Sequence, residues 1–197
     1  MIDIRAVCVF CGSSNGSRPE YGAAAEALGG ELARRGMSLV YGGGDVGTMG
    51  SLARAALAGG AKVTGVIPRK LYELVDHVEL TELVVATDMH ERKARMYESS
   101  DAFIALPGGI GTLDELFEAW TWRAIGYHAK PLGLLDVAGY YEPLLGFLRA
   151  TVAEGFLGKE QLEDLCVERE AGALLDRLAA KEPLTVFKRP ERSRRQA

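Results

Sequence analysis

Leu106-Pro107-Gly108-Gly109-Ile110-Gly111-Thr112-Leu113-Asp114-Glu115-Leu116 is the most informative segment of this 197-residue chain. The apolar residues 102–106 that lead into it predict a buried strand, and apolar residues then recur at helical spacing, at Leu113, Leu116, Phe117, Trp120 and Ala124. A glycine-rich turn between a strand and a helix predicts an anion site, because the first N–H groups of a helix have no partner within it. We therefore expect a phosphate-binding turn, with Glu115 one helical turn inside the helix.

The same residues have a second interpretation as a purely structural helix start. Thr112-x-x-Glu115 matches a capping box, in which the two side chains satisfy free backbone N–H groups. Three glycines are also compatible with nothing more than a tight connection. The sequence leaves both interpretations of Glu115 open.

Length and composition are those of an ordinary globular protein. Of the residues, 48% are hydrophobic and 25% are charged, and the length suits one buried core better than two. We expect a single domain over residues 1–183. Residues 184–197 are rich in basic side chains and lack apolar periodicity, which predicts a disordered tail.

Charge and hydropathy restrict the partners. The net charge of −4 gives no reason to expect a nucleic-acid partner. No apolar run approaches the ~20 residues that span a bilayer, and the first residues pass into a predicted strand without signal-peptide features. We expect a cytoplasmic protein that binds neither membrane nor nucleic acid.

Cysteines and histidines do not predict a redox or metal centre. Cys8 and Cys11 match C-x-x-C, but they lie at a predicted strand rather than at a helix start, where a thiolate would be stabilised. With Cys166 the number of cysteines is odd and too small for a disulfide scaffold. The histidines lack metal-ligand spacing: they are His77, His90 and His128. We expect neither a metal nor a cofactor.

Strand and helix patterns alternate along the chain. Strands are predicted at residues 4–10, 37–41, 62–67, 83–86, 102–106, 131–135 and 165–167. Helices are predicted at residues 20–35, 87–97, 112–124, 140–154 and 171–180, and a further helix is predicted to follow the turn that ends at Gly50 and to run to about Ala58. This alternation predicts an α/β fold, a Rossmann-like parallel sheet with helices on both faces.

Ligands of such sheets bind at the carboxyl ends of the strands. Four polar or glycine-rich segments fall there: the loop 11–19, the turn 42–47, the helix start at Asp88 and the turn 108–111. In the first loop, Ser14 is either a phosphate or ribose ligand or a helix cap. The convergence of these four segments on one edge of the sheet predicts a single pocket.

The turn 42–47 satisfies the dinucleotide pattern Gly-x-Gly-x-x-Gly. It follows the second strand rather than the first, and the third strand ends in residues 68–70 without the acid that binds a ribose. Arg69 keeps an NADP-binding protein as an alternative. We favour a second glycine-lined wall of a nucleotide pocket.

Met89, Arg92, Lys93 and Met96 share one face of the helix predicted at 87–97. Two cations among apolar anchors predict a semi-buried basic patch that faces a pocket. Alternatively, the aliphatic stems cover the surface while the charged ends reach water.

Several segments together resemble the Lonely Guy family of cytokinin riboside 5′-monophosphate phosphoribohydrolases, long labelled lysine decarboxylases. The resemblance spans about residues 4–180, and its most specific parts are Met89-His90-Glu91-Arg92-Lys93 and Pro107–Glu115. It implies a Rossmann-like homodimer with active sites near the interface. It also implies that Arg92 and Glu115 are catalytic.

The substrate-binding residues expected on these grounds are Ser14, Gly43, Gly44, Met89, Arg92, Lys93, Gly108, Gly109, Ile110, Gly111, Thr112, Glu115 and Thr121. Two departures stand out. Asp114 replaces the family's usual second Glu, and no residue in 71–80 aligns cleanly with an expected acidic contact, although Glu73 and Asp76 are candidates.

The reaction implied is hydrolysis of the N-glycosidic bond, which gives a free adenine-type base and ribose 5-phosphate. Glu115 would stabilise an oxocarbenium-like centre or activate water. One alternative is a general glycosidase of AMP and other nucleoside monophosphates, and another is a non-catalytic nucleotide-binding protein. A decarboxylase would need a Schiff-base lysine, for which Lys93 is the only pocket candidate.

Overall fold

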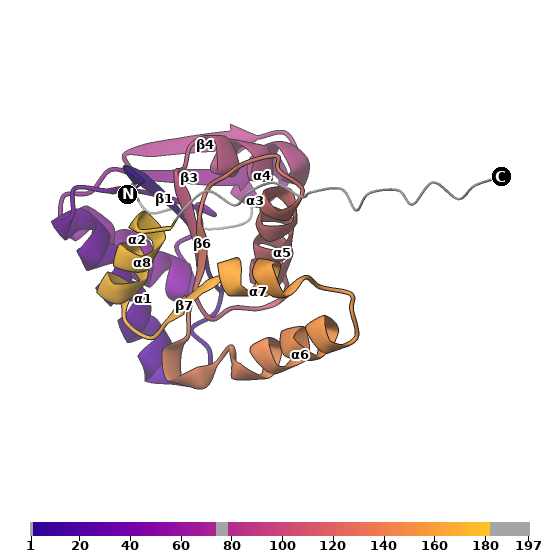
Figure 1. Cartoon of the computed structure of the whole chain (residues 1–197). Coiled ribbons are helices and arrows are strands. Elements are labelled where there is room, and N and C mark those ends of the chain that lie inside the picture. Colours follow the sequence, from indigo (N-terminus) through magenta and orange to yellow (C-terminus); the bar gives the residue numbers. More distant parts are fainter. Residues whose placement is uncertain (1, 74–78, 182–197) are drawn as a thin grey trace.

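A seven-stranded parallel sheet forms the centre of the molecule (Figure 1). The structure is a computed structural model, and it describes residues 2–73 and 79–181. The strand order is β4-β3-β2-β1-β5-β6-β7. The strands are β1 (Ala6–Phe10), β2 (Ser38–Tyr41), β3 (Val63–Pro68), β4 (Glu82–Ala86), β5 (Ala102–Ala105), β6 (Leu132–Leu135) and β7 (Cys166–Glu168). The predicted α/β fold is confirmed.

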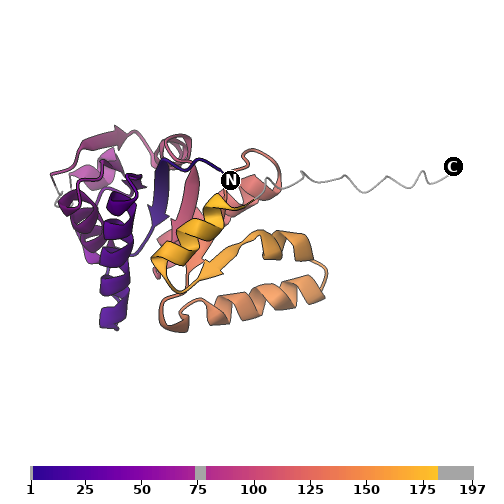
Figure 2. The ribbon, with the colours of Figure 1, turned by 60° about the vertical axis from the view of Figure 1, so that its left-hand side comes forward.

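Helices cover both faces of this sheet. They are α1 (Pro19–Arg34), α2 (Gly47–Ala58), α3 (Arg69–Tyr72), α4 (Met89–Glu98), α5 (Ile110–Ala124), α6 (Glu142–Ala153), α7 (Lys159–Asp164) and α8 (Ala171–Ala179), with a short 3-10 turn η1 (Val137–Gly139). In Figures 1 and 2, α6 and α7 lie side by side. No helix within the described residues is long and apolar enough to cross a membrane.

Alternation along the strands builds the two layers. Val7 and Val9 of β1 pack with α1, α2 and α8, whereas Cys8 and Phe10 of the same strand pack with α4, α5 and α6. Successive side chains of a strand point to opposite faces, so a strand that is apolar throughout is buried on both sides. This explains why the central strands are continuous apolar runs.

The structure corrects several predicted bounds. The strand predicted at 4–10 begins at Ala6, and the helix predicted at 140–154 begins at Glu142 because η1 precedes it. Within η1, Ala138 has a left-handed backbone (φ 53°, ψ 28°), which interrupts the helix. Helices α3 and α7 were not predicted. The predicted tail at 184–197 and the candidate Asp76 lie outside the described residues.

The strand order places β1 between β2 and β5. The chain winds from β1 outward to β4, then returns to the other side of β1 and continues to β7. The loops after β1 and β5 therefore leave the sheet in opposite directions and open a crevice between them, which is the usual ligand position in this architecture.

Candidate functional site

The loop after β1 is tied to the start of α2. The Thr48 hydroxyl accepts from Gly12 N (3.0 Å) and donates to Gly12 O (3.1 Å). Gly47 has a left-handed backbone (φ 60°), and a Cβ there would collide with the backbone of Ser14. The last glycine of the pattern 42–47 therefore serves loop packing.

Gly42 makes room for a charged side chain. A Cβ on Gly42 would lie 2.6 Å from Nη2 of Arg92. Gly43 and Gly44 also lie against the protein, but less closely: their hypothetical Cβ atoms would lie 3.2 Å from Ile67 Cβ and 3.1 Å from Met49 Cε. Gly42 thus forms part of the wall beside Arg92.

Helix α5 begins at Ile110, with Gly109 as its N-cap and without a side-chain cap. Among the described residues, the backbone N–H groups of Gly109, Ile110, Gly111 and Thr112 have no hydrogen-bond acceptor. Thr112 is buried, and a Cβ on Gly108 would collide with its hydroxyl. The capping-box interpretation of Thr112 and Glu115 is therefore wrong, and the helix presents free N–H groups with the partial positive charge of its terminus.

Helix α4 has the capped start that its sequence predicts. Asp88 Oδ1 accepts from His90 N (2.8 Å) and Glu91 N (2.9 Å). The Glu91 carboxylate accepts from Thr87 N (2.8 Å). This cap fixes where α4 begins, and Arg92 follows in the first turn of the helix.

Arg92 and Glu115 form an ion pair between α4 and α5. Arg92 Nη1 donates to Glu115 Oε1 (2.5 Å), and Arg92 Nε donates to the carbonyl of Val66 in β3 (3.0 Å). The two side chains are only 11% and 8% exposed. The structure therefore brings together the two residues expected to be catalytic.

Burial and pairing act on Glu115 in opposite directions. Burial raises the pKa of Glu115, and the charge and hydrogen bond of Arg92 lower it, while the nearby charge of Asp114 raises it further. The resulting pKa lies above the ordinary value. Arg92 thus offsets part of the cost of burying a carboxylate here.

Lys93 is paired with acids of α5. Its Nζ lies 3.2 Å from Asp114 Oδ2 and 3.1 Å from Glu118 Oε1, and its side chain is 10% exposed. Tyr97 donates to the same Glu118 (2.9 Å). The predicted burial of Arg92 and Lys93 is confirmed, and the alternative with charged ends in water is wrong. That the two cations face a pocket stays a prediction. Asp114, which is shorter than the Glu usual in the family, still reaches Lys93 and forms an ion pair with it.

A cavity of about 290 Å³ lies between the β1–α1 loop and the glycine turn. Its lining includes three expected residues, Ser14, Gly108 and Gly109, together with Tyr21 and Tyr140. Neither tyrosine is among the substrate-binding residues expected from the sequence. The position of Tyr140 just after a strand end, at the edge where ligands bind, is the signal that would have indicated it.

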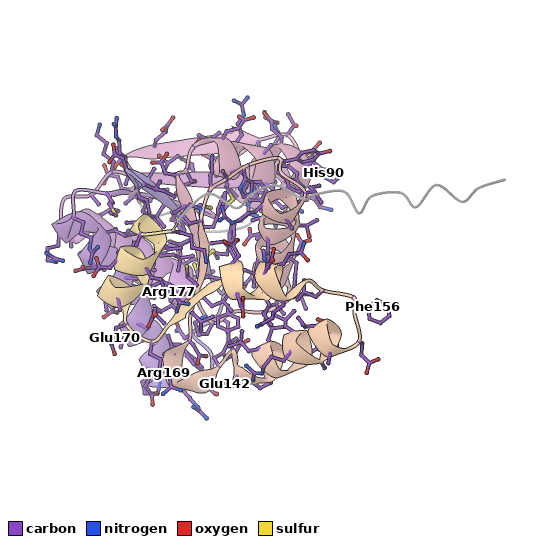
Figure 3. All side chains as sticks on the ribbon, in the orientation of Figure 1. His90, Glu142, Phe156, Arg169, Glu170 and Arg177 are labelled. Carbon is purple, nitrogen blue, oxygen red and sulfur yellow. The ribbon has the colours of Figure 1, made fainter. Side chains whose placement is uncertain are left out.

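Thr121 does not join this site within one chain. It lines an apolar groove of about 420 Å³ between α5 and the α6–α7 region, together with Phe117, Trp120, Leu148 and Phe156. Phe156 projects from the connection after α6 (Figure 3) and is 88% exposed. Thr121 thus lies on a different surface from Glu115.

Several of the remaining candidate residues are exposed on the surface. Met89 and Ile110 are the first residues of α4 and α5, and they are 44% and 89% exposed. The candidate Glu73 follows α3 and is exposed. His90 lies on the outer surface at the start of α4 (Figure 3). Within the described ranges, no group of three or more His, Cys, Asp or Glu residues is placed to hold a metal ion.

Comparison with known proteins identifies relatives of this chain. A family model described as "Possible lysine decarboxylase" matches residues 49–178. The probable cytokinin riboside 5′-monophosphate phosphoribohydrolase LOGL1 of Oryza sativa subsp. japonica is 53% identical over 77% of this chain and 68% of its own length. The cytokinin riboside 5′-monophosphate phosphoribohydrolase LOG7 of Arabidopsis thaliana is 47% identical over 91% of this chain and 83% of its own.

Solved structures with the same fold are more distant in sequence. A molybdenum cofactor binding protein from Rippkaea orientalis superposes with a TM-score of 0.66 at 22% identity, over 89% of this chain and 96% of that one. The molybdenum cofactor carrier protein of Chlamydomonas reinhardtii gives 0.68 at 21%, over 91% and 100%. Similarity at this level supports the fold alone.

Proposed function

This chain belongs to the Lonely Guy family of cytokinin riboside 5′-monophosphate phosphoribohydrolases, and we propose that it hydrolyses the N-glycosidic bond of nucleotides of that class. Water attacks C1′, the bond from C1′ to the base nitrogen breaks, and the base leaves with a proton. The products are a free N6-substituted adenine and ribose 5-phosphate. The pair of Arg92 and Glu115 beside the glycine turn is the observation that supports this most directly.

Glu115 has the chemistry that the reaction needs. Cleavage passes through an oxocarbenium-like state with positive charge near C1′. A carboxylate can stabilise this charge, or it can activate the water molecule that attacks C1′. Arg92 favours the ionised form of Glu115 and fixes its orientation through a hydrogen bond of 2.5 Å. We assign Glu115 the carboxylate role and Arg92 the role of its partner.

The start of α5 is suited to the 5′-phosphate. The free N–H groups of Gly109 to Thr112 and the helix dipole favour an anion there. Binding energy gained at the phosphate would be used to lower the barrier at C1′. No metal is required for this step.

Lys93 is poorly suited to the Schiff-base chemistry that the label lysine decarboxylase implies. Burial lowers the pKa of Lys93, but its hydrogen bonds to Glu118 and Asp114 raise it, and the net shift is upward. A Schiff base needs a neutral amine. The ion pairs therefore support a structural role for Lys93 rather than a nucleophilic one.

We further propose that the protein is a cytoplasmic homodimer. The groove that contains Thr121 and the exposed Phe156 supports a dimer, because large apolar surfaces favour association. The free, buried thiols Cys8, Cys11 and Cys166 fit a reducing compartment. Light scattering of the wild type and of Phe156→Asp tests the dimer: a monomeric wild type would contradict it.

The function is tested by following base release from AMP and from isopentenyladenosine monophosphate in parallel by chromatography. We expect faster release from the prenylated nucleotide. Comparable rates would instead indicate a general nucleoside-monophosphate glycosidase. No release from either nucleotide would favour a non-catalytic nucleotide-binding protein.

A further inference from the structure

Two consecutive tyrosines hold the turn at the start of α5 by its carbonyl groups. The Tyr141 hydroxyl donates to Leu106 O (2.6 Å), and the Tyr140 hydroxyl donates to Gly108 O (2.6 Å). We propose that Tyr140 is a positioning residue that orients this turn for the substrate phosphate. The proposal rests on the proposed function only for the identity of the anion.

The hydrogen bond to Gly108 O fixes a backbone donor. In a trans peptide the C=O and the following N–H point in opposite directions. Holding the Gly108 carbonyl therefore sets the direction of the Gly109 N–H, which has no acceptor among the described residues. Accepting a hydrogen bond at the carbonyl also polarises the peptide and makes its N–H a better donor.

The two tyrosines differ in their surroundings. Tyr141 is 1% exposed and belongs to the core between β6 and α6, so its hydroxyl serves a buried carbonyl. Tyr140 is 38% exposed and lines the cavity together with Gly108 and Gly109. Only Tyr140 therefore combines a bond to the turn with a position at the open side.

Further contacts hold Tyr140 in this position. Its ring packs edge-on against Tyr21, with centroids 5.7 Å apart and planes 77° apart. On its other side the turn is packed tightly, because a Cβ on Gly108 would lie 3.1 Å from Gly12 N and would collide with Thr112. The protein interior therefore packs against one side of the turn, and the phenol of Tyr140 holds the side that faces the cavity.

The two hydroxyl groups are expected to have different roles, one in the orientation of the turn and the other in the stability of the fold. Loss of the Tyr140 hydroxyl leaves Gly108 O near solvent, where water replaces the bond at little cost. Loss of the Tyr141 hydroxyl leaves the Leu106 carbonyl without a donor in the core. Tyr140→Phe is therefore expected to change anion binding, and Tyr141→Phe is expected to change stability.

The test uses the full-length chain and calorimetric titration with ribose 5-phosphate, which needs no turnover. Tyr140→Phe is expected to raise the Kd about five- to tenfold, the effect of one hydrogen bond, with a melting temperature within about 1 °C of the wild type. Tyr141→Phe is expected to lower the melting temperature by about 3 °C or more. Tyr127→Phe, which removes an exposed hydroxyl at the far end of α5, is the matched control and changes neither.

Kinetics adds a readout that a merely structural role would not move. In Tyr140→Phe the kcat/KM for AMP is expected to fall by the same factor as the Kd rises, because binding energy at the phosphate lowers the barrier at C1′. Hydrolysis of adenosine, which has no phosphate, is expected to be equal in the two proteins.

Three results would overturn the proposal. They are an unchanged Kd in Tyr140→Phe, a wild type that does not bind ribose 5-phosphate, and a loss of activity on adenosine in Tyr140→Phe as large as its loss of activity on AMP. Weaker binding in Tyr140→Phe, in a protein that hydrolyses no nucleotide, would support Tyr140 as a positioning residue while contradicting the proposed function. The two proposals are thereby tested separately.

Discussion

Arg92 of α4 donates to Glu115 of α5 across a separation of 23 positions in the sequence, at 2.5 Å. Both side chains are about nine-tenths buried, and the guanidinium also donates to the carbonyl of Val66 within β3. The carboxylate is therefore held in one orientation before any ligand arrives, which is a condition for efficient electrostatic catalysis.

Glu115→Gln keeps the shape of the side chain and removes its charge. We expect base release to fall by about 10² or more, because neither charge stabilisation nor water activation survives. Binding of AMP, measured by calorimetry, is expected to persist. Unchanged turnover in a folded Glu115→Gln protein would sink the catalytic assignment.

Arg92→Met leaves Glu115 buried without its partner. We expect the free energy of unfolding to fall by about 3 kcal/mol at neutral pH, since an unpaired buried charge is costly. Urea unfolding of Arg95→Met is the control. The exposed Arg95 pairs with Glu91 at 3.3 Å, and its loss is expected to cost less than about 1 kcal/mol.

The cost of Arg92→Met should also depend on pH. Burial raises the pKa of Glu115 in the folded protein, so the carboxylate form opposes folding above that pKa and the neutral form does not. The loss in free energy of unfolding of the variant, relative to the wild type, is thus largest at high pH. It becomes smaller as the pH falls and Glu115 takes up a proton. A deficit that is constant between pH 8 and pH 5 would contradict the role of the unpaired charge.

The acid limb of activity should follow Glu115. If its ionised form is required, kcat/KM falls as pH decreases, with an apparent pKa above the ordinary 4.5. Asp114→Asn removes a charge that raises the pKa of Glu115, so the limb should move to lower pH. Asp176→Asn, on α8 at the opposite face of the sheet, should leave the limb in place.

Ala138 lies in the left-handed region at φ 53°. This conformation costs an alanine about 1–2 kcal/mol, and a glycine adopts it freely. Part of the gain is lost because glycine is more flexible in the unfolded chain. We expect Ala138→Gly to raise the free energy of unfolding by about 0.5–1 kcal/mol in urea titration. A loss of stability would show that the alanine side chain contributes packing that outweighs the strain.

The regular elements could be predicted because each carries a local pattern. The segment 102–106 is apolar throughout, and the apolar residues of the helix that follows it repeat every 3.6 residues, so the sequence predicts both elements. The sequence also predicts Asp88 as a helix cap. Helices α3 and α7 have four and six residues, which is too short for a periodicity to appear. Their existence depends on packing that no short window contains.

The candidate site was predictable in its composition but not in its pairings. The spacing of Thr112 and Glu115 fits a capping box equally well, and only the structure, in which the helix begins at Ile110 and Glu115 pairs with Arg92 of another helix, decides between the two. Lys93 likewise finds Asp114 and Glu118 through the packing of α4 on α5. The hydrogen bond from Tyr140 to Gly108 joins segments 32 positions apart, beyond the reach of local spacing.

The central place of β1 has a consequence for synthesis on the ribosome. β1 is the first strand to be made, yet one of its edges pairs with β5, which ends at Ala105. Until that point emerges, the nascent chain presents an apolar, unpaired strand edge, the kind of surface that promotes aggregation. Nascent chains stalled before residue 105 has emerged from the ribosome should therefore depend on chaperones more than those stalled after it has emerged.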